Sequence, residues 1–251
     1  MRLLLTALLL LTASPALADA ASAFREGKWQ AAVAAGRAEA TPAGLIIAGR
    51  SQMAIAAWYT KERSQALALV IEAERDFDAA LAKAPGNVDA QMQKAVAVGY
   101  RAKLTKSPGL AKDSRRRFEA IRAAHPDNAI AWAAVGGWHA GAIATLGSFM
   151  ASAVVGAKTS EIDPNFLKAI KLDPDNPVHR AYYAMALMDL SKGNSAKAEK
   201  ALQGIGGLPA VDGYEAMARS QGVQLAAALK AGDMAAAQQL ARRLQAFGGL
   251  E

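Results

Sequence analysis

Three histidines and one carboxylate-rich turn are the residues whose chemistry could support a metal site or catalysis. His125, His139 and His179 lack the i, i+4 or short-loop spacing of metal ligands, and the chain has no cysteine to supplement them. Asp173 and Asp175 could begin a calcium loop, but prolines interleave them, which favours helix capping. The sequence also lacks a Gly-x-Ser-x-Gly elbow and a phosphate-binding glycine loop. We therefore expect a non-catalytic protein with no metal and no cofactor.

Regularly placed prolines divide the chain into units. These are Pro85, Pro126, Pro174 and Pro209, and the first three are followed two residues later by Asn87, Asn128 and Asn176. A proline ends a helix, and an asparagine after it can cap the next helix by accepting a bond from a free backbone N–H. The chain is rich in alanine and lacks alternating β-branched runs. The sequence therefore predicts an all-α protein.

Each of these units also carries a large apolar residue eight positions before its proline, as Phe77, Phe118 and Phe166 do. After Pro126 the chain reads Trp-Ala-Ala-Val-Gly over 132–136. With these features the chain resembles the tetratricopeptide repeat (TPR) family over residues 23–247. The resemblance implies a right-handed α-solenoid of about five stacked helical hairpins within a domain of residues 19–251.

The expected helices follow the same phase. A leading helix over 23–40 comes first, and the hairpins pair 42–59 with 61–84, 88–104 with 113–125, 129–142 with 163–172, 177–191 with 195–205, and 212–230 with 233–247. We expect a loop containing Pro108 and Gly109 inside the second hairpin.

In TPR stacks the first helices of successive hairpins line a concave groove, so the resemblance implies a partner-binding face. The residues placed there are Met92, Val96, Tyr100, Ile130, Ala133, Ala181, Met185 and Met188. Methionine adapts to irregular partners, which suits a peptide or a helix. Packing between neighbouring helices explains the same residues equally well. The Lys and Asn clamp that some TPR domains use for C-terminal carboxylates is absent at these positions.

The unit between Pro126 and Pro174 is longer than a common repeat, and the extra length falls around 141–160. Residues 129–157 contain no Asp, Glu, Lys or Arg. A buried helical pair, a membrane-associated segment and an exposed surface for a partner or self-association all remain open. With Trp132, Gly136 and Trp138 ahead of it, this hairpin also resembles the regulator-of-microtubule-dynamics group of TPR-like proteins, which implies a shared scaffold only.

Residues 1–18 have the pattern of a signal peptide. Arg2 precedes an apolar run over 3–11, and Ala16-Leu17-Ala18 supplies small residues before a cleavage site at Asp19. The apolar run is too short to span a bilayer. Without a cysteine the signal cannot be that of a lipoprotein. We expect an exported protein, free in a bacterial periplasm, with no transmembrane segment in the mature chain.

The formal net charge of the chain is +7, and it falls to +6 once Arg2 is removed with residues 1–18. A basic segment over 101–122 could form a patch for an anionic partner, although a solvated helix surface explains it too. Its principal residues are Arg101, Lys103, Arg115, Arg116 and Arg117. Nucleic acid is not expected, because no aromatic residues interleave these charges to stack bases.

Two functions follow from the sequence. The first is an exported scaffold that binds a protein or peptide in an apolar concave groove. The alternative is a self-assembling structural subunit, or an envelope-associated protein, that uses the 141–160 hairpin or the basic 101–122 surface.

Overall fold

The computed structural model describes residues 19–250, and every regular element in this range is a helix. The predicted signal peptide lies outside the described residues. Asp19 opens the described chain, and its side chain accepts a hydrogen bond from the Ser22 backbone N–H at 2.6 Å. The expectation of an all-α protein is confirmed.

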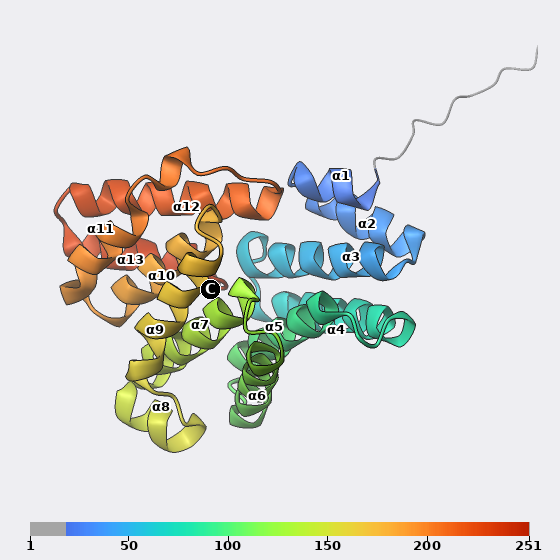
Figure 1. Ribbon diagram of the computed structural model, residues 1–251, viewed down its shortest axis with the longest axis horizontal. Helices are drawn as coiled ribbons and strands as arrows, with labels where there is room; N and C mark the ends of the chain where they lie inside the picture. Colours follow the sequence, from blue (N-terminus) through green and yellow to red (C-terminus); the bar gives the residue numbers. More distant parts are fainter. Residues whose placement is uncertain (1–18, 251) are drawn as a thin grey trace, which may run out of the picture.

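Each helix of the first half packs against the one that follows it (Figure 1). These helices are α1 (Ala20–Arg25), α2 (Trp29–Glu39), α3 (Pro42–Ala54), α4 (Arg63–Lys83), α5 (Val88–Thr105) and α6 (Pro108–Ala124). A π-helical turn, η1 (Ile55–Tyr59), extends α3.

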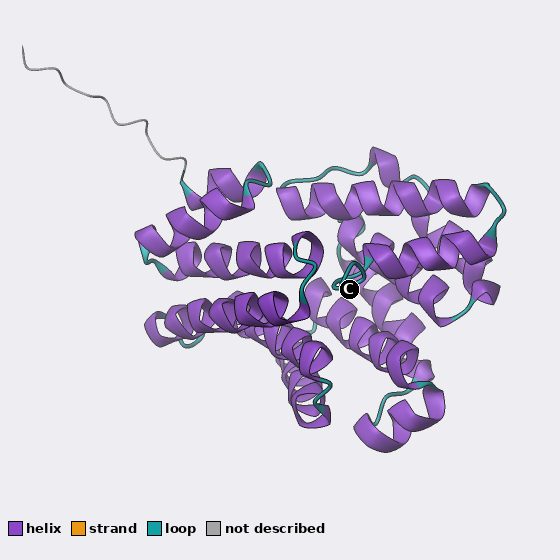
Figure 2. Cartoon of the chain, turned by 180° about the vertical axis from the view of Figure 1, so that it is seen from behind, coloured by secondary structure: helices purple, strands orange, loops and turns teal. Residues whose placement is uncertain are grey.

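The second half is organised around α10, which packs against α7, α9, α11, α12 and α13. Its helices are α7 (Ala129–Leu146), α8 (Ser148–Val155), α9 (Ile162–Leu172), α10 (Pro177–Leu190), α11 (Ser195–Leu202), α12 (Gly213–Lys230) and α13 (Met234–Leu244). Short 3-10 turns lie at Thr159–Glu161, Lys192–Asn194 and Ile205–Gly207. Figure 2, in which helices are purple and loops teal, shows no strand among the described residues.

The repeated asparagines cap helices as the sequence predicts. Asn87 accepts a hydrogen bond from the Ala90 N–H at 2.9 Å at the start of α5, and Asn128 accepts one from the Ala131 N–H at 3.0 Å at the start of α7. Asn176 caps α10 in the same way. Each bond satisfies a backbone donor that the first turn of a helix leaves free.

The three repeated phenylalanines are buried, and two of them lie close to glycines. A Cβ on Gly49 of α3 would lie 2.4 Å from the Phe77 ring, and one on Gly136 of α7 would lie 2.9 Å from the Phe166 ring. The absence of a side chain on α3 and α7 therefore lets each helix approach its packing partner, α4 or α9, closely.

Two expectations are corrected. Pro108 and Gly109 do not lie in a loop: Pro108 is the first residue of α6, where its missing N–H costs nothing, and the Ser107 hydroxyl caps the helix. The single leading helix expected over 23–40 is two helices, α1 and α2. The extra length around 141–160 is largely helical, because α7 continues to Leu146 and α8 follows it.

The two halves of the chain also meet at its ends. Helix α1 packs against α12, and a Cβ on Gly213 would lie 2.6 Å from the Cα of Gly27. The Arg50 guanidinium lies 3.6 Å from the Asp212 carboxylate and 4.5 Å from the centre of the Phe24 ring. These contacts bring α12 against the first helices (Figure 1).

The capping bonds generate a stability prediction. Asn128→Ala should lower the free energy of unfolding by about 1 kcal/mol, because the Ala131 N–H loses its partner. Asn128→Asp, which keeps the acceptor oxygen, should retain most of the stability. Urea denaturation monitored by circular dichroism measures both variants, and an equal loss in the two would contradict a capping role.

Candidate interaction surface

Half of the predicted groove residues are in the interior. Met92, Ala181, Met185 and Met188 are buried, so a partner cannot reach their side chains without opening the fold. This corrects the sequence-based expectation for these four residues. Met92 packs with Phe118 between α5, α6 and α7. The three residues of α10 are covered because neighbouring helices surround this helix.

The other four predicted residues are accessible to different degrees. Val96, Tyr100 and Ala133 are half-buried, and Ile130 is exposed. Tyr100 is the one that contacts the most distant parts of the chain. On α10 one half-buried residue is Tyr182, which directly follows the predicted Ala181 and so lies about 100° further around the helix.

Aromatic side chains from five separate segments meet on this inner face. We call Trp58, Tyr100, Tyr182, Tyr214 and Phe247 the inner aromatic cluster. The hydroxyls of Tyr182 and Tyr214 lie 2.7 Å apart, and the ring of Tyr214 packs edge-on against Trp58 with centroids 5.8 Å apart. Tyr100 packs edge-on against Phe247 at 4.9 Å. Edge-to-face packing at these separations is favourable for aromatic pairs.

The tyrosine hydroxyls of the cluster are neutral. Burial raises the pKa of Tyr182 and that of Tyr214 above the ordinary value of 10.0. Both groups therefore remain protonated at neutral pH and can donate as well as accept hydrogen bonds.

The chain's own C-terminal segment, residues 244–250, contributes Phe247 to this cluster and lies against Trp58 and Tyr100. The indole N–H of Trp58 donates to the carbonyl of Leu244 at 2.8 Å, and the Phe247 N–H donates to the carbonyl of Ala57 at 2.9 Å. The Lys103 ammonium donates to the carbonyl of Ala246 at 2.8 Å. Backbone hydrogen bonds and one aromatic anchor thus hold the segment in place.

Phe247 has an uncommon backbone conformation. Its φ is +66°, in the left-handed region that a bulky residue rarely adopts. The side chain is nevertheless buried, packed among Met53, Phe77 and Leu104. Burial of the ring offsets the local strain, which indicates that the surrounding face determines the shape of the segment.

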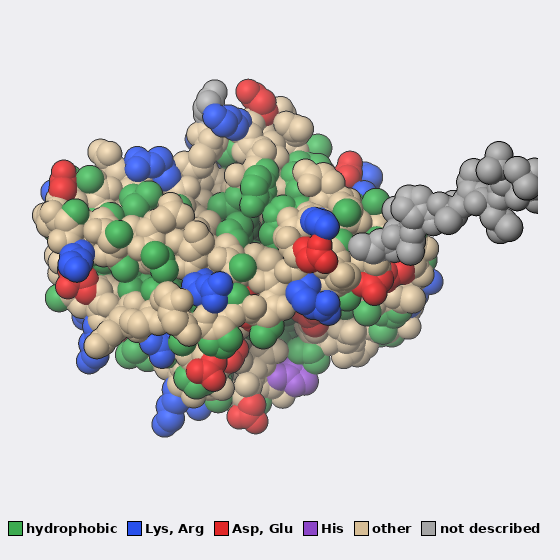
Figure 3. Space-filling model, turned by 90° about the horizontal axis from the view of Figure 1, so that it is seen from above, with side chains coloured by type: hydrophobic (Ala, Val, Ile, Leu, Met, Phe, Trp, Pro, Cys, Tyr) green, Lys and Arg blue, Asp and Glu red, His purple; other side chains and the backbone are tan. Residues whose placement is uncertain are grey.

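The space-filling view from above shows a hollow near the centre of the molecule, with hydrophobic side chains along it (Figure 3). A pocket of about 250 Å³ borders the C-terminal segment and is lined by Ala57, Trp58, Tyr59, Thr60, Lys61, Arg243 and Gly249. Trp58 therefore belongs both to the inner aromatic cluster and to the wall of this pocket.

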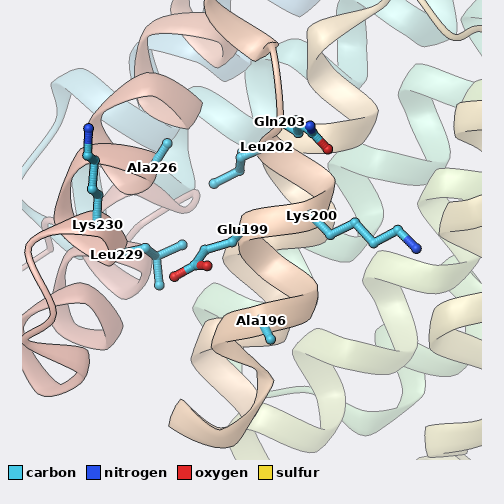
Figure 4. A pocket seen from close by; sticks show the side chains of 8 residues that line it. All are labelled: Ala196, Glu199, Lys200, Leu202, Gln203, Ala226, Leu229 and Lys230. Atoms are coloured by element: carbon cyan, nitrogen blue, oxygen red, sulfur yellow. The ribbon is translucent and has the colours of Figure 1, made fainter.

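A second, more open pocket of about 640 Å³ lies between α11 and α12 (Figure 4). Its charged side chains do not converge: Lys200 and Lys230 extend away in opposite directions, while Glu199 points toward Leu229. Such an arrangement places no acid and base around a common reacting atom. Within residues 19–250 no group of three or more His, Cys, Asp or Glu side chains could hold a metal ion.

The basic residues of 101–122 do not form one continuous patch. Arg101 pairs with Glu74 of α4 at 2.9 Å, and Lys103 is bonded to the C-terminal segment. Arg116 and Arg117 of α6 both pair with Asp113. Arg115 donates to the carbonyls of Val155 and Gly156, at 3.0 and 2.8 Å, at the C-terminal end of α8.

His139 of α7 is hydrogen-bonded to the segment that follows α8. Its Nδ1 accepts a hydrogen bond from the Lys158 N–H at 3.1 Å, and the ring packs edge-on against Trp138. Burial lowers the pKa of His139 to about 4. A neutral ring is required for this acceptor role, so His139 supports the hairpin and binds no proton at neutral pH.

The uncharged stretch 129–157 differs in burial along its length. Helix α7 is the one helix among the described residues that is long and apolar enough to cross a bilayer, but Val135, Gly136 and Ile143 are buried in the fold. Helix α8 instead exposes large apolar side chains, with Phe149 80% exposed. Helix α7 also exposes Ile130 and Leu146, so the uncharged stretch contains both buried and exposed apolar residues.

Sequence patterns missed most of the inner aromatic cluster. Trp58, Tyr182, Tyr214 and Phe247 share no spacing or motif, because they come from distant segments. The one available signal was that Tyr182 adjoins a predicted groove residue.

Comparison of the chain with models of known protein families and with curated proteins finds no match.

The contacts of the C-terminal segment yield a second stability prediction. Phe247→Ala should lower the free energy of unfolding by about 3 kcal/mol, because it removes a buried ring. Trp58→Phe should cost about 1 kcal/mol, since it keeps a ring but removes the donor to Leu244. Urea denaturation measures both losses. A Phe247→Ala variant as stable as the wild type would show that the segment is not held by its ring.

The low pKa of His139 predicts acid sensitivity. The ordinary pKa of histidine is 6.5, and that of His139 in the folded chain is about 4. At a pH between these two values the unfolded chain therefore binds a proton at this residue that the folded chain does not. The free energy of unfolding should therefore fall as the pH drops through this range, by about 3 kcal/mol in total.

The substitution His139→Asn tests this cause, because the side-chain oxygen of asparagine can still accept a hydrogen bond from the Lys158 N–H. His139→Asn should show a clearly smaller fall, although His179, whose pKa burial also lowers, continues to contribute. Urea denaturation at a series of pH values provides the comparison. An unchanged pH dependence in the variant would exclude His139 as the source.

Proposed function

We propose that this chain is an exported, non-catalytic scaffold of the TPR type that binds a protein or peptide segment on its inner face. The observation that carries the proposal is the seating of the chain's own C-terminal segment against the inner aromatic cluster. That contact is a peptide held on this face within the same molecule.

The TPR-type assignment rests on sequence and local structure together. Phe77, Phe118 and Phe166 are buried at equivalent positions of their units, and an asparagine caps the helix that follows each unit's proline. An α-solenoid of about five hairpins accounts for this recurrence. Export rests on the signal-peptide pattern of residues 1–18.

The contacts of the C-terminal segment suggest the chemistry of the partner. Three hydrogen bonds join backbone groups of the segment to the face, and Phe247 supplies an aromatic anchor. A partner segment with one aromatic or large apolar side chain and a free backbone matches the same donors and acceptors. These contacts involve backbone groups and one ring of the segment, so recognition needs no charge on the partner.

Site-specific photo-crosslinking tests this function. A benzophenone amino acid at Tyr182 should crosslink a protein of the cell envelope when the chain is expressed with its N-terminal segment. The same amino acid at Glu199, which is exposed on α11, is the matched control. The Phe247→Ala variant should increase the Tyr182 crosslink, because it loosens the segment that occupies the face.

Equal products from Tyr182 and Glu199 would contradict an inner-face site. Strong crosslinking from Tyr182 that the Phe247→Ala change leaves unaltered would place the partner elsewhere on that face.

A further inference from the structure

The positive charge of the chain is concentrated in one segment of the sequence, and this segment includes α6, which packs beside the exposed apolar helix α8. Residues 101–122 contain eight Lys or Arg and two Asp or Glu, a net charge of +6. Residues 19–251 together also have a net charge of +6, so the rest of this region is balanced. The uncharged stretch 129–157, which includes α8, follows in the sequence. Such an asymmetry is typical of a surface that meets an anionic partner.

Helix α8 forms an apolar tip. Phe149 and Met150 of α8 are 80% and 48% exposed, and Leu146 at the end of α7 is 43% exposed, whereas Ala151 and Val155 of α8 are buried. Glycines with positive φ at 147 and 156 begin and end the helix. The apolar side chains are therefore presented by a short, well-defined helix and not by an irregular loop.

Helix α6, which carries most of the basic residues, holds this tip from the side. Arg115 bonds to the carbonyls at the end of α8, and the Trp138 indole N–H donates to the carbonyl of Ala111 at 3.0 Å. Figures 1 and 2 show α6 and α8 along the same edge of the molecule, away from α12. The apolar tip and the basic helix thus belong to one surface.

Some of this charge is neutralised locally. Asp113 accepts bonds from Arg116 and Arg117, which lower its pKa, and Glu119 lies 3.6 Å from Arg115. Lys106 and Lys112, at the start of α6, and Lys158, shortly after α8, are exposed cations, and Arg116 is exposed although it shares Asp113 with Arg117.

We propose that the edge formed by α8 and the N-terminal half of α6 docks on the surface of an anionic phospholipid bilayer. Phe149 and Met150 enter the interface between headgroups and acyl chains, and the surrounding lysines and arginine meet the phosphates. Apolar insertion and electrostatic attraction together give stable but reversible binding of this kind.

A second copy of the chain is a poorer occupant for the same surface. A symmetric contact between two α8 tips would bring two strongly basic helices together, which is repulsive. A tip of three large apolar side chains is also small beside the area that a stable dimer buries.

Vesicle cosedimentation of residues 19–251 tests the proposal. One set of vesicles contains phosphatidylcholine alone, and the other has about one third phosphatidylglycerol. Binding is expected to the anionic vesicles and should weaken as salt is added. Phe149→Ser should weaken it about tenfold. Lys112→Gln combined with Arg116→Gln should weaken it about 25-fold, or about fivefold for each charge.

Matched controls separate the surface from general effects. Val211→Ser removes an exposed apolar side chain ahead of α12, and Lys192→Gln with Lys200→Gln removes two exposed charges near α11. Both control variants should bind like the wild type.

Three results would overturn the proposal. The first is equal binding to neutral and anionic vesicles, and the second is binding that Phe149→Ser leaves intact. The third is an absence of vesicle binding together with a dimer, seen by light scattering, that Phe149→Ser dissociates. None of these results bears on the inner face, whose test uses Tyr182.

Discussion

The rest of the arrangement depends on the contact of Phe247 with the inner face. Trp58 and Leu244 are 186 residues apart in sequence, and the hydrogen bond between them joins the last helix to the end of α3. The Phe247 ring then fills a space beside Tyr100 that the stacked helices leave open. Without this contact α13 would be attached mainly through α10 and α12. The Phe247 ring therefore links the last helix to the first half of the chain, in addition to the contact between α1 and α12.

The molecule has two surfaces with different chemistry. The inner face is aromatic, contains neutral hydroxyls and already holds a segment of the same chain. The outer edge at α8 is apolar at its tip and basic along its side. Tyr182 on the first surface and Phe149 on the second belong to different helices that do not share a hydrogen bond. Each surface can thus be changed by mutation without altering the other.

Much of the helix pattern could be predicted because it is local. Asn128 caps α7 through a residue three positions away, and a proline ends a helix through its own ring. The candidate surface was predicted only in part. Tyr100 was identified from its place on a first helix, but Met185 was assigned to the groove, since nothing local shows that several helices enclose α10. Phe247 reaches the cluster through contacts between distant segments, which no local spacing encodes.

The central claim is that the inner face binds a peptide, and it can be measured with the segment that occupies it. The chain is ended after Arg243, its helical content is verified by circular dichroism, and a peptide of residues 244–250 is titrated into it by calorimetry. We predict saturable binding that restores the stability lost on truncation, and no binding by a peptide in which Phe247 is replaced by alanine. A folded, truncated chain that binds neither peptide would contradict the account.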